Sequence, residues 1–176
     1  EMIDVVAENA PGERLSADQQ TEVNTAAEHL KENHSNSAYA QFAAMLKAKL
    51  AVDNNDLDTA ASELQWALDN DPAAATERLV RLRLARVEAA RGNIDTALQM
   101  VQGIDAAEMK SSYEEAKGDF YLLQDNSAAA FTAYESAIAS NASQDPMIKN
   151  ILQLKISQVL PPEVDTVEVS EDSEGA

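Results

Sequence analysis

Residues 118–138 read GDFYLLQDNSAAAFTAYESAI, a pattern that predicts two short helices folded back on each other. The first helix is expected to end near Leu123 and the second to cover residues 127–140, because the Gln-Asp-Asn turn between them favours tight backbone geometry and a helix start. Gly118 and Ala130 have almost no side chain, so the two helices can approach closely. Three aromatic side chains are expected to fill the space around this contact: Tyr121, Phe131 and Tyr134.

Two earlier parts of the chain repeat this arrangement. Ala60, Ala97 and Ala130 occupy equivalent places in three second helices and are 37 and then 33 residues apart. This spacing resembles that of the tetratricopeptide repeat, whose period is about 34 residues. The repeat also wants a small residue in the middle of each first helix, where this chain has Ala48, Ala85 and Gly118. Lys47 departs from the pattern, since leucine is usual there. The resemblance implies an all-α, tetratricopeptide-repeat-like α-solenoid of about three helical hairpins.

Further helices are expected to cap both ends of this stack. Ser16 and Gln19 have the spacing of a capping box, which predicts a helix that ends near residues 34–36. Pro146 follows an aspartate, an arrangement typical of a helix start. The final helix should cover the open end of the last repeat with one apolar face, formed by Ile148, Ile151, Leu152, Ile156 and Val159.

These elements divide the chain into three segments. Residues 16–160 are predicted to form the helical repeat domain. Residues 1–15 are expected to be the end of a helix that begins upstream, followed by a turn at Pro11 and Gly12. Residues 161–176 contain six acidic residues and no basic ones, which predicts a flexible acidic tail. The alternative is that this segment packs against the domain as an extended arm through its valines.

The composition excludes several classes of function. Hydrophobic residues make up 45% of the chain but aromatic residues only 5%, which favours helices over strands. The 31 acidic and 13 basic residues give a net charge of −18, so most of the surface would repel a phosphate backbone and no nucleic-acid partner is expected. The absence of cysteine removes disulfides, thiolate catalysis and cysteine-ligated zinc.

No constellation of side chains indicates a catalytic, metal or cofactor site. His29 and His34 are five positions apart, so on a helix they point in different directions and do not share a metal. Residues 53–58 superficially resemble a calcium loop, but Leu57 and Asp58 stand where an oxygen ligand and a glycine are needed. We interpret this segment as a turn between helices, and we expect a protein that is not an enzyme.

The concave side of such a solenoid is lined by the first helices of the hairpins and usually binds partners. Alignment of the three copies on their small residues places ten residues there: Phe42, Met45, Lys49, Val52, Leu79, Leu82, Arg86, Glu115, Asp119 and Leu122. This partly apolar groove suits an extended or helical apolar segment of another protein. The alternative is that Leu79 and Leu82 are covered by the N-terminal segment or by neighbouring helices.

Five of the basic residues lie close together in the middle copy: Arg78, Arg81, Arg83, Arg86 and Arg91. They are scattered around the helix, so they form either a docking site for an acidic partner or local pairs with Glu77 and Glu88. Some repeat domains clamp a peptide carboxylate with basic and amide groups at set positions. Here those positions hold Met45, Lys49, Arg83, Ser112 and Ala116, so a full clamp is absent.

The order of segments resembles one particular family. A capping helix precedes the repeats, Leu84-Ala-Arg-Val87 opens the middle copy, Gly118-Asp119 lies in the third, and the final helix carries Met147-Ile-Lys-Asn-Ile-Leu-Gln-Leu-Lys155. This arrangement is similar to the YfgM family of bacterial inner-membrane proteins. The resemblance implies a periplasmic domain of a single-pass inner-membrane protein, attached to the membrane only through an anchor upstream of this chain.

The same resemblance implies protein partners. Members of that family are ancillary to the SecYEG translocon and work with a PpiD-like chaperone on newly exported chains. Two alternatives remain open: a chaperone-like holder of unfolded chains that uses the apolar groove, and a generic cytosolic repeat adaptor.

Overall fold

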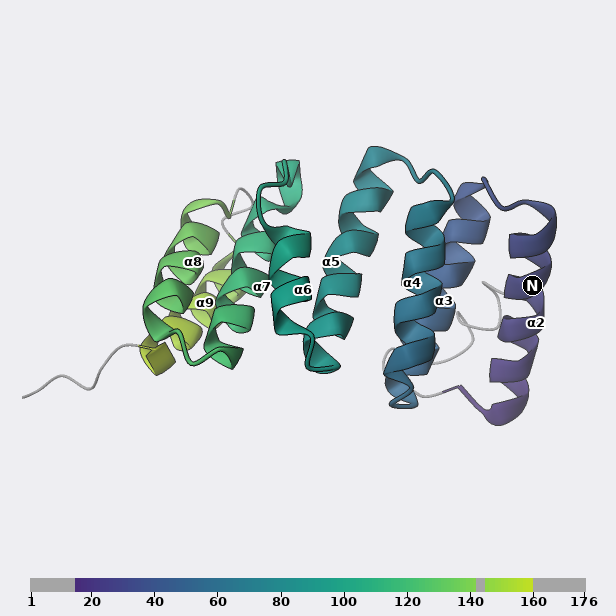
Figure 1. Ribbon diagram of the computed structural model, residues 1–176, viewed down its shortest axis with the longest axis horizontal. Coiled ribbons are helices and arrows are strands. Elements are labelled where there is room, and N and C mark those ends of the chain that lie inside the picture. Colours follow the sequence, from purple (N-terminus) through teal and green to yellow (C-terminus); the bar gives the residue numbers. More distant parts are fainter. Residues whose placement is uncertain (1–14, 142–144, 160–176) are drawn as a thin grey trace, which may run out of the picture.

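The computed structural model describes residues 15–141 and 145–159, and within these ranges the chain is helical with no strand (Figure 1). The all-α prediction is therefore confirmed. The described elements are α2 (Ala17–Asn33), α3 (Ala38–Asp53), α4 (Leu57–Asp69), α5 (Ala74–Ala90), α6 (Ile94–Val101), the 3-10 turn η1 (Ala107–Met109), α7 (Lys110–Leu123), α8 (Ser127–Ala139) and α9 (Pro146–Val159). The predictions for an upstream helix in residues 1–15 and for the tail in residues 161–176 fall outside the described residues, apart from Leu15.

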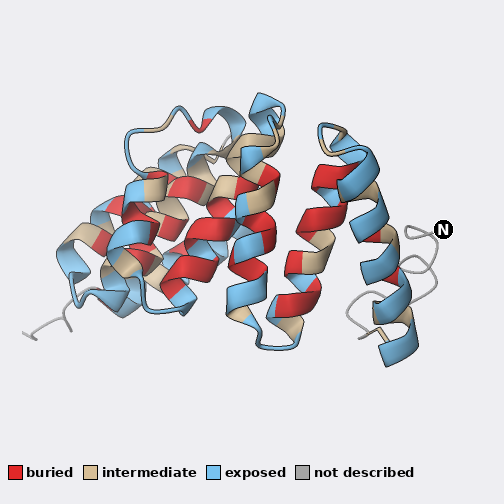
Figure 2. Ribbon diagram, turned by 45° about the vertical axis from the view of Figure 1, so that its right-hand side comes forward, coloured by how far each residue is buried: buried red, intermediate tan, exposed pale blue. Residues whose placement is uncertain are grey.

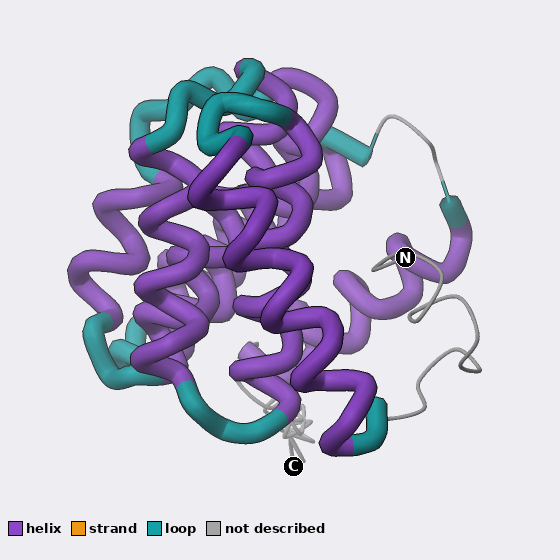
Figure 3. Tube along the Cα trace, turned by 90° about the vertical axis from the view of Figure 1, so that its right-hand side faces the viewer, coloured by secondary structure: helices purple, strands orange, loops and turns teal. Residues whose placement is uncertain are grey.

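Helices α2 to α8 follow one another in chain order along the long axis of the molecule, and α9 lies back beside α7 and α8 (Figure 1). Three antiparallel hairpins, α3/α4, α5/α6 and α7/α8, form the stack, and their connecting loops gather at the two ends of the helices (Figure 3). Helix α2 packs on the first hairpin through Val23 and Ala27, while α9 packs on the third through Leu152 and Val159. The predicted solenoid of three hairpins with a capping helix at each end is confirmed.

The three hairpin turns are built alike. Each begins with a residue in the left-handed region, namely Asn55 at φ 59°, Gly92 at φ 88° and Asp125 at φ 58°. The next residue donates its N–H to a carbonyl five positions back, over 2.8 to 2.9 Å, which satisfies an orphan carbonyl of the ending helix. These bonds join Asp56 to Ala51, Asn93 to Glu88 and Asn126 to Tyr121. The acidic segment at residues 53–58 is therefore the turn between α3 and α4, as predicted.

The small residues lie at the seams between helices. Ala48 and Ala85 are buried, and Gly118 is buried against the ring of Tyr134. A Cβ atom at Gly118 would lie 2.8 Å from Tyr134 Cζ and closer still to Cδ1 and Cε1. Buried residues accordingly face neighbouring helices, whereas exposed ones line the outer surface (Figure 2). The hairpin α7/α8 therefore closes only because this position has no side chain.

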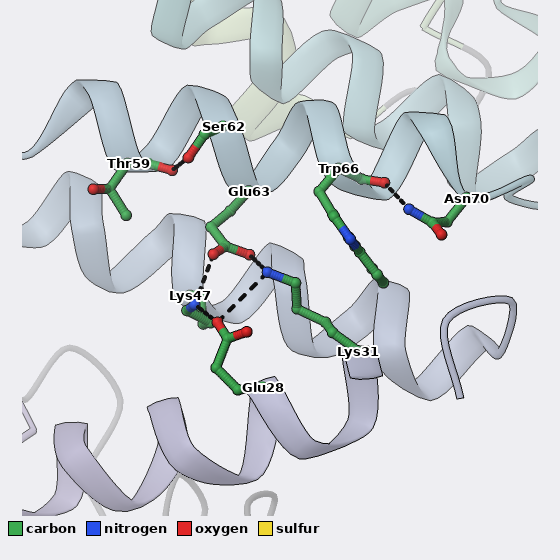
Figure 4. Close-up of polar contacts among 8 residues, drawn as sticks. All are labelled: Glu28, Lys31, Lys47, Thr59, Ser62, Glu63, Trp66 and Asn70. Atoms are coloured by element: carbon green, nitrogen blue, oxygen red, sulfur yellow. Dashed lines mark hydrogen bonds and ion pairs between the residues drawn. The ribbon is translucent and has the colours of Figure 1, made fainter. Parts of the chain in front are cut away.

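A partly buried network of charges ties the N-terminal capping helix to the first hairpin (Figure 4). The Glu63 carboxylate on α4 accepts hydrogen bonds from Lys31 of α2 at 2.7 Å and Lys47 of α3 at 2.6 Å. Lys47 also pairs with Glu28, and Lys31 lies 4.9 Å from the centre of the Trp66 ring. Lys47, which stands where the repeat usually has leucine, thus joins three helices through charge rather than apolar contact.

Two members of the network, Glu28 and Lys47, have shifted pKa values. The hydrogen bond from Lys47 holds the pKa of Glu28 below its usual value, despite an opposing effect of burial. Burial by itself would lower the pKa of Lys47, but hydrogen bonds to Glu28 and Glu63 outweigh it, so the pKa of Lys47 is raised. Both shifts stabilise the charged forms, and the capping contact is complete at neutral pH.

We predict that Gly118→Ala destabilises the protein. Alanine favours a helix over glycine by about 1 kcal/mol, yet the clash with Tyr134 should cost more and leave a net loss of about 2 kcal/mol in the free energy of unfolding. Urea denaturation measures this change.

The matched control is the same substitution in a Tyr134→Leu background, where the ring that would clash is gone. In that background, Gly118→Ala should lower the free energy of unfolding by no more than half as much as it does in the wild type. An equal loss of stability in both backgrounds would contradict the conclusion that the Tyr134 ring excludes a side chain at position 118.

The charge network generates a prediction about pH. Because the pKa of Glu28 is lowered in the folded chain, its contribution is present above the pKa of an unfolded glutamate and is lost as the pH falls through the lowered value. Wild type should be more stable than Glu28→Gln at neutral pH, and this difference should close at acidic pH. Urea unfolding across that range measures it. Glu22→Gln, on the exposed side of the same helix, serves as the control; a wild-type advantage over Glu28→Gln that is independent of pH would contradict the prediction.

Candidate protein-binding surface

An apolar pocket of about 320 Å³ opens between α3, α4 and α5, on the side formed by the first helices of hairpins one and two. Its apolar wall consists of Met45, Ala48, Val52, Leu57, Leu64, Val87 and Ala90. Three cationic side chains complete the lining: Lys49, Arg83 and Arg86. The site is thus an apolar hollow with positive charge at its edge, in a chain whose net charge is −18.

Helical spacing explains how the pocket forms. On α3 the lining residues recur three and four positions apart, from Met45 through Ala48 and Lys49 to Val52, so they share one face. On α5 the same spacing runs from Arg83 to Ala90. Because Ala48 and Ala90 are short, the two helices leave a hollow between them instead of filling it.

The three cations are engaged to different degrees. Lys49 Nζ lies 2.6 Å from Asp53 Oδ2, although the Lys49 side chain remains 66% exposed. Arg86 lies 3.7 Å from Glu115, longer than a hydrogen bond. The Arg83 side chain is exposed and makes no ion pair or hydrogen bond with any other residue of the part of the chain that the structure describes. The charge of Arg83 is therefore available to a partner, whereas Lys49 and Arg86 each already have a carboxylate nearby.

The structure brings together four of the ten residues that the sequence places on the binding face: Met45, Lys49, Val52 and Arg86. Phe42 lies on the same helix and is 50% exposed, outside the pocket. The repeat pattern did not place the other six lining residues on this face. These are Ala48, Leu57, Leu64, Val87, Ala90 and Arg83, of which only Arg83 was considered for binding, as one of five clustered arginines and as part of a carboxylate clamp. Arg83 and Val87 lie three positions before and one after Arg86, that is, four positions apart, and this helical spacing could have placed them on the same face.

Leu82 corrects the predicted surface, because it is only 2% exposed. It belongs to the core of the second hairpin together with Ala85 and with Tyr113 of α7, which covers it. Leu79 is half-buried against the core of the first hairpin. The alternative that neighbouring helices cover these leucines is therefore correct for Leu82, and no partner reaches that side chain in this fold.

The predicted residues of the third hairpin are engaged by the C-terminal capping helix. Lys155 of α9 donates hydrogen bonds to Glu115 at 2.8 Å and to Asp119 at 2.7 Å. The Tyr134 hydroxyl donates to Asp119 as well, and burial together with this carboxylate raises the pKa of Tyr134. Leu122 is 37% exposed and lies outside the pocket. Glu115 and Asp119 therefore serve as an anchor for α9.

Helix α9 itself is only partly covered. Leu152 and Val159 are buried and Ile156 packs beside them, as predicted for the cap. Ile148 and Ile151, which were expected on the same covered face, are instead exposed, and Met147 and Leu154 are more than 60% exposed. About two turns of α9, from Met147 to Leu154, thus expose apolar side chains.

Comparison with known proteins agrees with this architecture. The family model described as a tetratricopeptide repeat-like domain matches residues 6–160, which is most of the chain. The chain belongs to this family. Within the described residues, no helix has both the length and the hydropathy needed to cross a membrane.

Curated relatives make the resemblance more specific. The chain is 27% identical over 123 residues to a protein of Escherichia coli strain K12, a match that covers 70% of the chain and 59% of the relative. It is 29% identical over 105 residues to a protein of Aggregatibacter actinomycetemcomitans, a match that covers 60% of the chain and 52% of the relative. It is 27% identical over 115 residues to a protein of Haemophilus influenzae, a match that covers 65% of the chain and 56% of the relative. Each is named ancillary SecYEG translocon subunit.

The predicted similarity to the YfgM family is thereby confirmed. The matched part of the chain spans between half and three-fifths of the length of these relatives.

The burial pattern generates a prediction that separates core from surface. Leu82→Asp should destabilise the protein by about 3 kcal/mol or more, because it buries an unpaired carboxylate. Val52→Asp should change the free energy of unfolding by about 1 kcal/mol or less, since Val52 is 44% exposed. Urea denaturation measures both. A well-folded Leu82→Asp variant would contradict the position of Leu82 in the core.

Proposed function

We propose that this chain is a non-enzymatic protein-interaction scaffold, the periplasmic part of an ancillary subunit of the SecYEG translocon. The observation that carries the proposal is the open pocket on the first-helix face of a repeat stack, in a chain whose curated relatives are named for that role. A repeat stack supplies binding surface and no reaction chemistry. Within the described residues, no cluster of histidine and carboxylate side chains is arranged to hold a metal ion.

The partners in this proposal are the translocon, a PpiD-like chaperone and newly exported chains. The surface formed by α3 and α5 is the contact face, because Phe42, Val52 and Arg83 are exposed there and the pocket is open beside them. A membrane anchor upstream of this chain would hold the domain beside the exit of the translocon. The strong negative charge of the domain would keep it soluble at high local concentration.

A second function is favoured by a different observation. The exposed apolar residues of α9, with Met147 and Leu154 the most open, form a surface that can hold an unfolded chain. In this reading the domain is a chaperone-like holder. Suppression of aggregation of an unrelated client would support it, and Leu154→Ser should then weaken that activity.

The proposed function is tested by site-specific photocrosslinking in the native cells. A photoreactive residue at Val52 of the full-length protein should crosslink to subunits of the translocon or to its associated chaperone. The control is the same residue at Glu22, on the exposed face of α2, where these crosslinks should be absent. Equal crosslinking at both positions, or only unrelated proteins at Val52, would contradict the proposal.

A further inference from the structure

We propose that the pocket between α3, α4 and α5 selects one kind of partner segment: an extended stretch of another protein in which a large apolar side chain is followed directly by acidic residues. This inference rests on the proposed function and specifies the chemistry of its partner. Three features of the site lead to it, namely the apolar hollow, the cationic rim and the charge of the rest of the molecule.

The hollow fixes the apolar part of the ligand. Its wall carries Met45, Val52, Leu57 and Val87, and its volume of about 320 Å³ leaves ample room for a large aliphatic or aromatic side chain. The transfer of such a side chain from water into an apolar site contributes about 1.5 to 3 kcal/mol. A polar side chain gains nothing there, because the wall offers no hydrogen-bonding group apart from the cations at the edge.

The rim fixes the charge of the neighbouring residues. Lys49, Arg83 and Arg86 surround the opening, and the Arg83 guanidinium is not engaged by any described residue. Arginine presents a planar fork of donors that matches a carboxylate in two parallel hydrogen bonds. Arg86 sits 3.7 Å from Glu115, so a ligand carboxylate can compete for it. A lysine or arginine placed beside the apolar side chain would be repelled.

The overall charge makes this rim selective. The chain carries −18, and the acidic residues elsewhere repel an acidic segment. At physiological ionic strength the Debye length is about 8 Å, so distant charges are screened and the charges near the pocket determine binding. There the three cations of the lining outnumber Asp53 and Glu115, the two carboxylates paired with them. An acidic segment therefore gains at this opening and not on the remaining surface.

The test is an NMR titration of the isotope-labelled chain with three short blocked peptides in a glycine and serine background. One carries leucine followed by two glutamates, the second carries leucine followed by two lysines, and the third carries serine followed by two glutamates. The first should bind with a Kd about tenfold or more below those of the other two, because only it offers both an apolar side chain for the wall and carboxylates for the cations of the rim. The chemical-shift changes that it causes should map to residues 45–52 and 83–90.

Two substitutions with a matched control locate the interaction. Arg83→Glu, an exposed position, should weaken binding of the leucine-glutamate peptide about tenfold or more, and Lys49→Glu should act in the same direction. Lys149→Glu makes the same change in net charge on α9 and should leave the Kd unchanged. Ala90→Leu, which fills the pocket, should abolish the preference for leucine over serine.

Three results would overturn the inference. The first is equal binding of the leucine-glutamate and leucine-lysine peptides, and the second is an Arg83→Glu chain that binds the leucine-glutamate peptide like wild type. The third is a chain ending at residue 159 that binds this peptide about tenfold more tightly than the full chain. The third result would assign the pocket to the acidic segment 161–176 of the chain itself. Lost peptide selectivity with intact crosslinking at Val52 would remove this inference alone, whereas the reverse pattern would remove the proposed function.

Discussion

The close approach of paired helices at positions without side chains is the constraint on which the rest of the structure depends. At Gly118 the Tyr134 ring occupies the space that a Cβ atom would need, so α7 and α8 meet almost backbone to ring. Ala48 and Ala85 occupy the corresponding places in the other hairpins and are equally buried. Since each hairpin closes tightly, the next can stack against it, and the first helices fall into a continuous row.

The pocket and the capping contacts follow from this row. Between α3 and α5 the short side chains of Ala48 and Ala90 leave a hollow, with cations on its edge. At the two ends the row is closed by charge: Lys31 of α2 joins the first hairpin through Glu63, and Lys155 of α9 joins the third through Asp119. Basic residues are scarce in this chain, with 13 of 176, and those at the two ends of the row hold helices together.

Sequence periodicity predicted the hairpins, their turns and the buried small residues, because each of these is set by local spacing. It also placed Met45, Lys49, Val52 and Arg86 on one binding face. It failed at Leu82, since a helical period identifies a face of one helix but not whether the next hairpin covers that face. The roles of Lys47 and Lys155 were missed for a related reason: their carboxylate partners lie 16 or more positions away along the chain, and only the folded stack brings them together.

The central claim is that this domain engages its partners through the surface of α3 and α5. Hydrogen exchange of the full-length protein, alone and bound to the detergent-solubilised translocon with its associated chaperone, tests it most directly. The account predicts that binding slows amide exchange chiefly in residues 45–52 and 83–90. Slowed exchange confined to α9 or α2, with those two segments unchanged, would contradict it.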